Sequence, residues 1–213
     1  MNKTNIDWPG LVYTWNPVTG CKRGCHYCYA KKMYNRFNKT TFDQIVFHPE
    51  RLSQPKSVKS PTVIFVGSMT DIAYWTIDEK LAVMKVCYEC PQHTFMFLSK
   101  SSGAYMGIDI PKNAMCGLTV TSIDSLNYDY IVWFASAYKR PFLSIEPILG
   151  KIEYPIPDKF ELVIVGAMTG KGALPHDQSW VDSVFEKSYC KNIHLKQNVK
   201  KEVDCGTKNI AVG

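Results

Sequence analysis

The sequence predicts an α/β fold, a compact partial (β/α)6 TIM-like barrel that forms a single domain over residues 1–213. Short apolar runs rich in β-branched residues recur along the chain, as in strands that are buried on both faces of a parallel sheet. Segments with helical periodicity alternate with these runs, which favours parallel strands joined by right-handed crossovers. Six or seven such units suit a barrel or partial barrel better than a small open sheet.

The expected elements follow one another along the whole chain. A Thr76-to-Glu79 spacing is a capping-box pattern, which starts a helix. In that helix Cys87 and Cys90 share an apolar stripe with Val83, so this C-x2-C pair is predicted to be core rather than metal-binding. The apolar runs predict strands at 11–15, 62–67, 94–99, 115–120, 141–145, 162–166 and 192–195, and helices are predicted at 29–37, 76–90, 125–137 and 179–188.

Composition restricts the class of protein. The apolar share of 46% is that of a folded globular chain,. No run approaches the roughly 20 apolar residues of a membrane span, and the N-terminal residues lack the apolar core of a signal peptide. We therefore expect a cytoplasmic protein without membrane contact. In that reducing compartment the eight cysteines are expected to be metal-binding, catalytic or buried rather than paired in disulfides,.

Positive charge is concentrated in the N-terminal third. Residues 1–60 contain 10 lysines and arginines against three acids, whereas the remaining residues are nearly neutral. This field favours a nucleotide or nucleic-acid partner. A solvated basic surface is the alternative explanation, and such cations also offset the negative charge of an iron–sulfur site.

Polar and small residues follow the predicted strands. Since the carboxyl ends of barrel strands meet at one edge, where such folds build their sites, we expect these residues to form one site. The candidates include Ser68, Asp71, Lys100, Thr121 and Glu146.

The first strand leads into a cysteine loop, residues 17–30, which contains Cys21-x3-Cys25-x2-Cys28. A structural zinc site normally has four ligands in two pairs, and a [4Fe–4S] cluster normally has four thiolates. A cluster held by three thiolates keeps one iron open for a substrate or cofactor. Two alternatives use the same thiols: a zinc-bound nucleic-acid-binding module without catalysis, and a cluster protein that carries or senses electrons.

The spacing of these cysteines, with Tyr27 before the last of them, resembles the radical S-adenosylmethionine superfamily. Further segments extend the resemblance, in order, over nearly the whole chain. Together they resemble a phage- and prokaryote-associated group of three-cysteine, radical-SAM-like proteins of unassigned function. The segments are TWNPVTGC (14–21), CHYCYA (25–30), FVGSMTD (65–71), HTFMFLSK (93–100), GLTVTS (117–122), PFLSIEPILG (141–150), VIVGAMTG (163–170) and HLKQ (194–197).

The resemblance implies a set of ligands. Cys21, Cys25 and Cys28 each bind one iron of a [4Fe–4S] cluster, and the remaining iron chelates the amino and carboxylate groups of S-adenosylmethionine. Tyr27 lies near the adenine, as does the segment that contains Gly166. The family's Gly-Gly-Glu turn is replaced here by Gly67-Ser68-Met69, with Asp71 two residues further on. Ribose or carboxylate contacts are expected from Thr119, Thr121, Ser144 and Glu146.

The resemblance also implies a reaction. A one-electron reductant, flavodoxin- or ferredoxin-like, reduces the cluster, S-adenosylmethionine is cleaved, and the 5′-deoxyadenosyl radical takes a hydrogen atom from a substrate. Lys100 and Glu146 are expected to orient that substrate or move protons, with an ion pair between them or with a neighbour as the alternative. In the C-terminal tail, residues 196–213, Lys196 and Gln197 match a pair in the family. Cys205 is expected to be an exposed thiol, with hydrogen-atom donation or service as an extra ligand as the alternatives.

Overall fold

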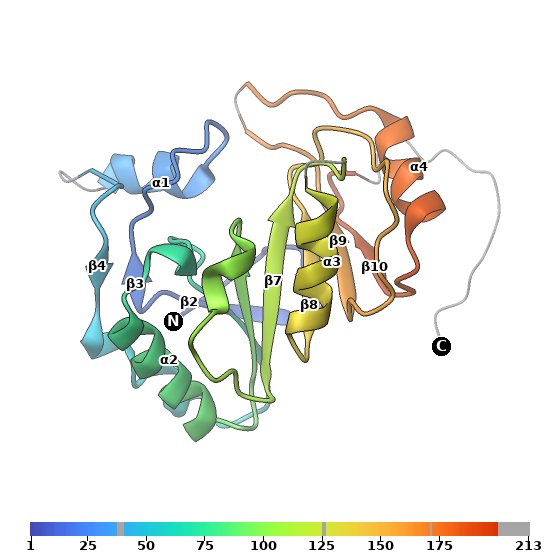
Figure 1. Cartoon of the computed structure of the whole chain (residues 1–213). Coiled ribbons are helices and arrows are strands. Elements are labelled where there is room, and N and C mark those ends of the chain that lie inside the picture. Colours follow the sequence, from blue (N-terminus) through green and yellow to red (C-terminus); the bar gives the residue numbers. More distant parts are fainter. Residues whose placement is uncertain (38–40, 125–126, 171, 200–213) are drawn as a thin grey trace.

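The computed structural model describes residues 1–37, 41–124, 127–170 and 172–199. Its main feature is one eight-stranded sheet in the order β1-β2-β5-β6-β7-β8-β9-β10 (Figure 1). All neighbours from β2 to β10 are parallel, and β1 is antiparallel to β2. The strands are β1 (Asn2–Lys3), β2 (Leu11–Trp15), β5 (Val63–Val66), β6 (Thr94–Ser99), β7 (Ala114–Val120), β8 (Pro141–Ile145), β9 (Leu162–Val165) and β10 (Ile193–Leu195).

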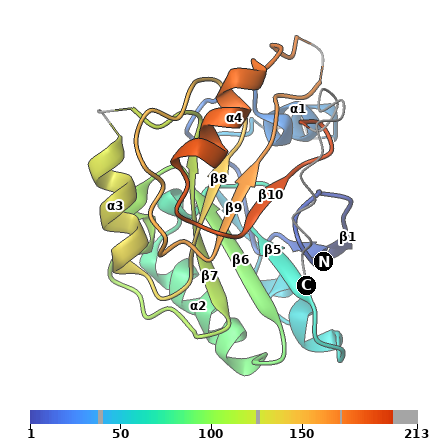
Figure 2. The same cartoon turned by 90° about the vertical axis from the view of Figure 1, so that its right-hand side faces the viewer.

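Four α-helices lie where the sequence predicts them: α1 (Tyr29–Phe37), α2 (Ile77–Glu89), α3 (Tyr128–Ala137) and α4 (Gln178–Lys187). The predicted capping box starts α2, because Thr76 accepts from the Glu79 amide and Glu79 accepts from the Thr76 amide. The strand order runs without reversal, so every right-handed crossover passes over the same face of the sheet. Figure 2 shows α2 and α3 on one side of the strands and the N-terminal segment on the other.

The α/β class is confirmed, but the structure shows no closed barrel. The sheet is open, with β1 and β10 at its edges in the described chain. Two crossovers differ from regular β/α units: η4 (Ser102–Tyr105), a 3₁₀ turn, lies between β6 and β7, and an irregular segment joins β8 to β9. The sequence reading missed several elements that are too short to show periodicity: β1, the small sheet of β3 (Val18–Thr19) and β4 (Val46–Phe47), and the 3₁₀ turns η1 (Pro49–Arg51), η2 (Gln54–Ser57), η3 (Ile72–Tyr74) and η4.

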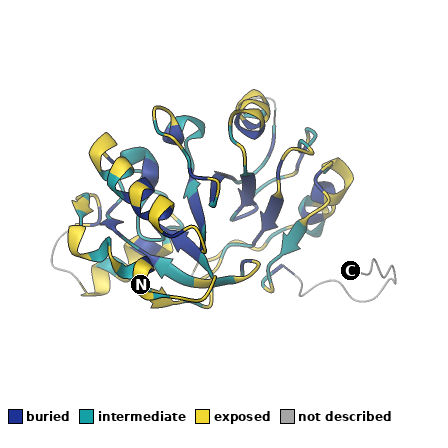
Figure 3. Ribbon diagram, turned by 90° about the horizontal axis from the view of Figure 1, so that it is seen from below, coloured by how far each residue is buried: buried dark blue, intermediate teal, exposed yellow. Residues whose placement is uncertain are grey.

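The two faces of the sheet have different roles because side chains alternate along each strand. One face packs against the helices and forms the larger core, which includes Cys87 and Cys90 as predicted and also contains Cys116. Figure 3 shows the buried residues concentrated in the strands and exposed residues on the outer sides of the helices. No helix in the described ranges has both the length and the apolar character needed to cross a bilayer.

The opposite, inner face holds a second apolar cluster toward the amino ends of the strands. The indole of Trp8, from the segment before β2, lies 4.5 Å from the ring of Phe65 and 5.7 Å from that of Phe142, measured between centroids. Trp8 is only 6% exposed. The N-terminal segment therefore covers the lower half of the inner face and leaves the carboxyl half open. The cluster comprises Trp8, Phe65, Met96, Met115, Phe142, Leu162 and Ile164.

Candidate functional site

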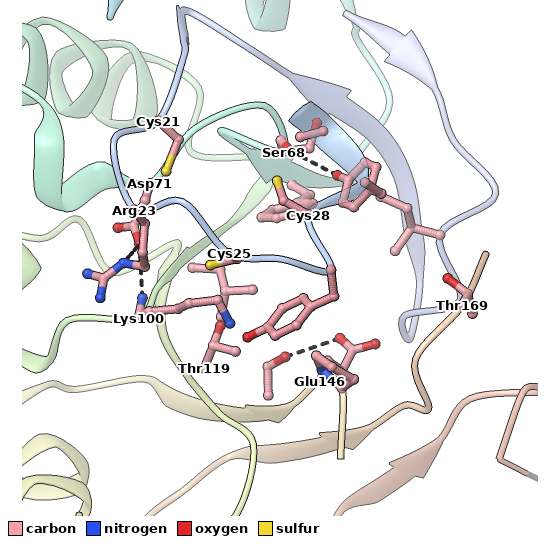
Figure 4. A pocket seen from close by; sticks show the side chains of 18 of the residues that line it. Cys21, Arg23, Cys25, Cys28, Ser68, Asp71, Lys100, Thr119, Glu146 and Thr169 are labelled. Atoms are coloured by element: carbon pink, nitrogen blue, oxygen red, sulfur yellow. Dashed lines mark hydrogen bonds and ion pairs between the residues drawn. The ribbon is translucent and has the colours of Figure 1, made fainter. Parts of the chain in front are cut away.

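A cavity of about 390 Å³ lies at the carboxyl half of the inner face. We call it the central cavity. Its volume falls in the range of about 300–1,000 Å³ that is typical of small-molecule sites. The cysteine loop forms one wall and the strand ends form the other (Figure 4), and Trp8 also lines the cavity. The structure thus brings the cysteine loop and the strand-end residues to one place, as the sequence predicted.

The cysteine loop is fixed by backbone contacts just before its first thiol. Gly20 has a φ of +94°, and a Cβ at this position would lie 1.9 Å from the carbonyl oxygen of Gln44. The Gly20 amide donates to the Met69 carbonyl at 3.0 Å, and the Cys21 amide donates to the Phe42 carbonyl at 2.8 Å. Only glycine allows this close approach of two backbone segments, so the sequence places Cys21 at the cavity wall.

All three predicted ligands, Cys21, Cys25 and Cys28, line the central cavity, and each is a free, partly buried thiol. Burial raises the pKa of the Cys21 thiol, and the Asp71 carboxylate acts in the same direction. A ligand that needs the thiolate must therefore displace a proton here. Within the described ranges, no three His, Cys, Asp or Glu side chains gather closely enough to hold a single metal ion.

Tyr27 and Lys100 meet across the cavity. The Lys100 ammonium lies 5.2 Å from the centroid of the Tyr27 ring. Burial raises the pKa of Tyr27 to about 12, so its hydroxyl stays neutral. Burial also lowers the pKa of Lys100. The alternative of an ion pair between Lys100 and Glu146 is not formed, because none of the ion pairs among the described residues includes Lys100, whereas Glu146 pairs with a neighbour, Lys196.

Asp71 is a buried acceptor that joins three segments of the site. Its Oδ1 accepts from the Ser99 hydroxyl at 2.6 Å and from the Ala73 amide at 3.0 Å. Its Oδ2 accepts from the Lys100 amide at 3.1 Å and lies 3.3 Å from Arg23 Nε. These contacts hold η3, the end of β6 and the cysteine loop together. Asp71 lines the cavity as predicted, but both carboxylate oxygens already have protein partners.

Glu146 is held by three side chains, including one from each end of the described chain. Its Oε1 lies 2.6 Å from the ammonium of Lys196. Its Oε2 accepts from the Trp8 indole at 2.9 Å and from the Ser144 hydroxyl at 3.1 Å. Sequence reasoning missed Trp8 as part of the site, and the only signal for it was a tryptophan just before the first predicted strand.

Most of the other predicted site residues reach the central cavity. Gly166 does not line it but packs behind the Glu146–Lys196 pair, and Thr121 lines a neighbouring hollow instead. Thr121 lies beyond the end of β7, where the alternation of side chains no longer holds. Cys205 and the rest of the tail after residue 199 lie outside the described residues. The predicted residues that line the cavity together with the cysteines are Tyr27, Gly67, Ser68, Asp71, Lys100, Thr119, Ser144 and Glu146.

A family model described as "Protein of unknown function (DUF5131)" matches residues 3–202. No curated protein and no solved structure matches the chain. The family match covers both the cysteine loop and the parallel strands from β2 to β10. The chain therefore belongs to the DUF5131 family of proteins of unknown function.

Proposed function

We propose that the chain is a radical S-adenosylmethionine enzyme. One observation carries the proposal: the three thiols of the Cys21-x3-Cys25-x2-Cys28 loop line the same small-molecule-sized cavity as the polar ends of the parallel strands. A protein that used these thiols only to stabilise a loop has no need of a cavity beside them.

The three thiols suit a [4Fe–4S] cluster better than a single zinc ion. A zinc ion requires ligands that converge on one point, whereas each thiolate of a cluster binds its own iron. Thiols spread around a cavity wall fit the second requirement. Cys21, Cys25 and Cys28 are the residues that hold the cluster, and Arg23 and Lys100 line the same cavity.

The order of the strands in the sheet supports the same proposal. The six strands β2, β5, β6, β7, β8 and β9 are parallel and lie in chain order. A partial (β/α)6 barrel needs this sequential order, and an open edge leaves room for a substrate to enter. We assign the domain to this class, with β10 as an added parallel strand.

When bound, the cluster and S-adenosylmethionine supply a 5′-deoxyadenosyl radical that abstracts a hydrogen atom from the substrate. The chain itself excludes water and fixes positions. Trp8 and the inner apolar cluster close the floor of the cavity. Trp8, Ser144 and Lys196 hold the Glu146 carboxylate in one orientation, so that it can orient a substrate hydroxyl or amine,.

The reaction needs one electron from outside the chain, and the donor docks on α1. This helix begins directly after Cys28, and residues 22–36 contain five basic residues and no acid. Tyr29, Met33 and Phe37 follow a four-residue spacing and are 49%, 47% and 82% exposed. An apolar stripe with a basic surround fits an acidic carrier protein of the flavodoxin or ferredoxin kind.

The test is anaerobic reconstitution with iron and sulfide, reduction in the presence of S-adenosylmethionine, and assay for 5′-deoxyadenosine. We expect about four irons per chain and slow release of 5′-deoxyadenosine. Both should be lost in Cys25→Ala and retained in Cys90→Ala, a matched control at a buried cysteine directly after α2. A protein that takes up only zinc and leaves S-adenosylmethionine intact would refute the proposal and favour a nucleic-acid-binding module.

A further inference from the structure

We propose that a second hollow, beside the central cavity, binds the phosphate group of a mononucleotide substrate. We call it the side hollow. The proposal rests on the proposed function, because it assumes that the cluster and S-adenosylmethionine fill the central cavity and leave the substrate to bind next to it. Four residues line both spaces, so a ligand in one reaches the other: Arg23, Tyr27, Lys100 and Thr119.

The side hollow is positively charged. It has a volume of about 470 Å³, and among the described residues the cations Arg23 and Lys100 line it while no aspartate or glutamate does. Hydroxyl groups of Ser101, Ser102 and Thr121 add neutral hydrogen-bond donors to the same wall. Two cations with hydroxyl donors and no carboxylate make a site for an anion.

The two cations differ in their partners, since Arg23 is paired with Asp71, a residue that does not line the side hollow. In the described part of the chain, Lys100 forms no ion pair, and its ammonium contacts the face of the Tyr27 ring. Arg23 places its Nε 3.3 Å from Asp71 and its guanidinium carbon 5.8 Å from the Tyr74 ring centroid. Burial disfavours the charged form of Lys100 and lowers its pKa. A bound anion would reverse this effect and stabilise both cations.

The chemistry of the wall favours a phosphate ester over a simple carboxylate. A phosphate group presents three acceptor oxygens, which match an arginine, a lysine and several hydroxyls at once. Tyrosine rings lie on the same wall, Tyr27 on the side of the central cavity and Tyr130, 63% exposed, at the rim. Such rings stack nucleic-acid bases. The hollow has the size of a small-molecule site, which favours a mononucleotide over a longer strand.

The proposal is tested on the chain without cluster, under reducing conditions, by isothermal titration with a nucleoside 5′-monophosphate and with the matching nucleoside. We expect the monophosphate to bind at least about 10-fold more tightly, the usual effect of hydrogen bonds to a charged group. Lys100→Ala should abolish that difference and Lys100→Arg should retain most of it. Lys112→Ala, an exposed lysine just before β7 at the opposite edge of the sheet, is the charge-matched control and should bind like the wild type.

Thr121→Val gives a second variant that alters the side hollow alone, since Thr121 does not line the central cavity. It should weaken monophosphate binding by about 3- to 10-fold and leave nucleoside binding unchanged. Equal binding of nucleoside and monophosphate would overturn the proposal. The proposal would also be overturned if S-adenosylmethionine competes with the monophosphate and both Lys100→Ala and Thr121→Val abolish that competition. The anion bound in the side hollow would then be the carboxylate of S-adenosylmethionine. Binding of an oligonucleotide but of no mononucleotide would also overturn the proposal.

These outcomes are separate from those of the proposed function. The titration needs neither cluster nor turnover, so 5′-deoxyadenosine release without monophosphate binding refutes only the substrate site. Monophosphate binding by a chain that cannot cleave S-adenosylmethionine refutes only the enzymatic reaction.

Discussion

Replacing Asp71 with alanine is expected to lower the free energy of unfolding by about 3–5 kcal/mol. Asp71 as a whole residue is 6% exposed, and its carboxylate accepts from the Ser99 hydroxyl and from the amides of Ala73 and Lys100. Its removal leaves these donors without an acceptor, at about 1–3 kcal/mol for each one that stays buried. It also removes the partner of Arg23. The expected loss is smaller than the sum of these separate costs, because water can enter the space that the carboxylate leaves. It equals the loss that is typical of breaking a buried charge pair.

Urea denaturation followed by circular dichroism measures this loss. Asp71→Asn preserves the shape and one acceptor oxygen but sets an amide against donors, so we expect an intermediate loss of about 1–3 kcal/mol. Asp158→Ala, on the exposed surface, is the control and should change stability by less than about 0.5 kcal/mol,. A loss below about 1 kcal/mol in Asp71→Ala would show that the hydrogen bonds to Asp71 do not hold the three segments together.

Three further predictions concern other parts of the site. Burial raises the pKa of the Asp7 carboxyl, but hydrogen bonds from the Gln197 amide and from His194 outweigh this and leave it below 3.8. The stabilising effect of the Asp7 carboxylate should be complete above pH 3.8 and be lost as the pH falls through its lower pKa in the folded state,. The midpoint of urea unfolding should therefore fall more steeply with decreasing pH in the wild type than in Asp7→Asn. Gly166→Ala would place a Cβ 2.5 Å from Glu146 Oε1. The release of 5′-deoxyadenosine should therefore drop at least about tenfold, while the free energy of unfolding falls by only about 1–3 kcal/mol. Unchanged release would contradict the role of the Glu146 carboxylate. Phe37→Asp should slow S-adenosylmethionine cleavage driven by a carrier protein and leave cleavage driven by dithionite unchanged, and equal slowing with both reductants would argue against docking on α1.

The strands and helices could be predicted from the sequence because each has a local physical signature. The buried parallel strands appear as apolar runs, since both faces pack against other side chains. The start of α2 is encoded by the capping box at Thr76. The grouping of Cys21, Lys100 and Glu146 was predictable as well, because the carboxyl ends of parallel strands meet at one edge whatever the details of packing.

The partners of those side chains were decided only by tertiary structure. Trp8 and Glu146 are 138 positions apart, and their hydrogen bond exists because the N-terminal segment crosses the inner face of the sheet. Glu146 pairs with Lys196 rather than with Lys100, since Lys196 follows β10 near the end of β8 while Lys100 points over Tyr27.

The same limit applies to the shape of the sheet. An apolar run predicts that a strand is buried but not whether the last strand reaches the first, because closure depends on strand tilt and stagger across the whole sheet. The sequence by itself therefore determined the α/β class, the order of the elements and the edge that holds the site. Tertiary structure decided that the sheet stays open, and that Asp71 and Trp8 hold the site in place through contacts between distant segments.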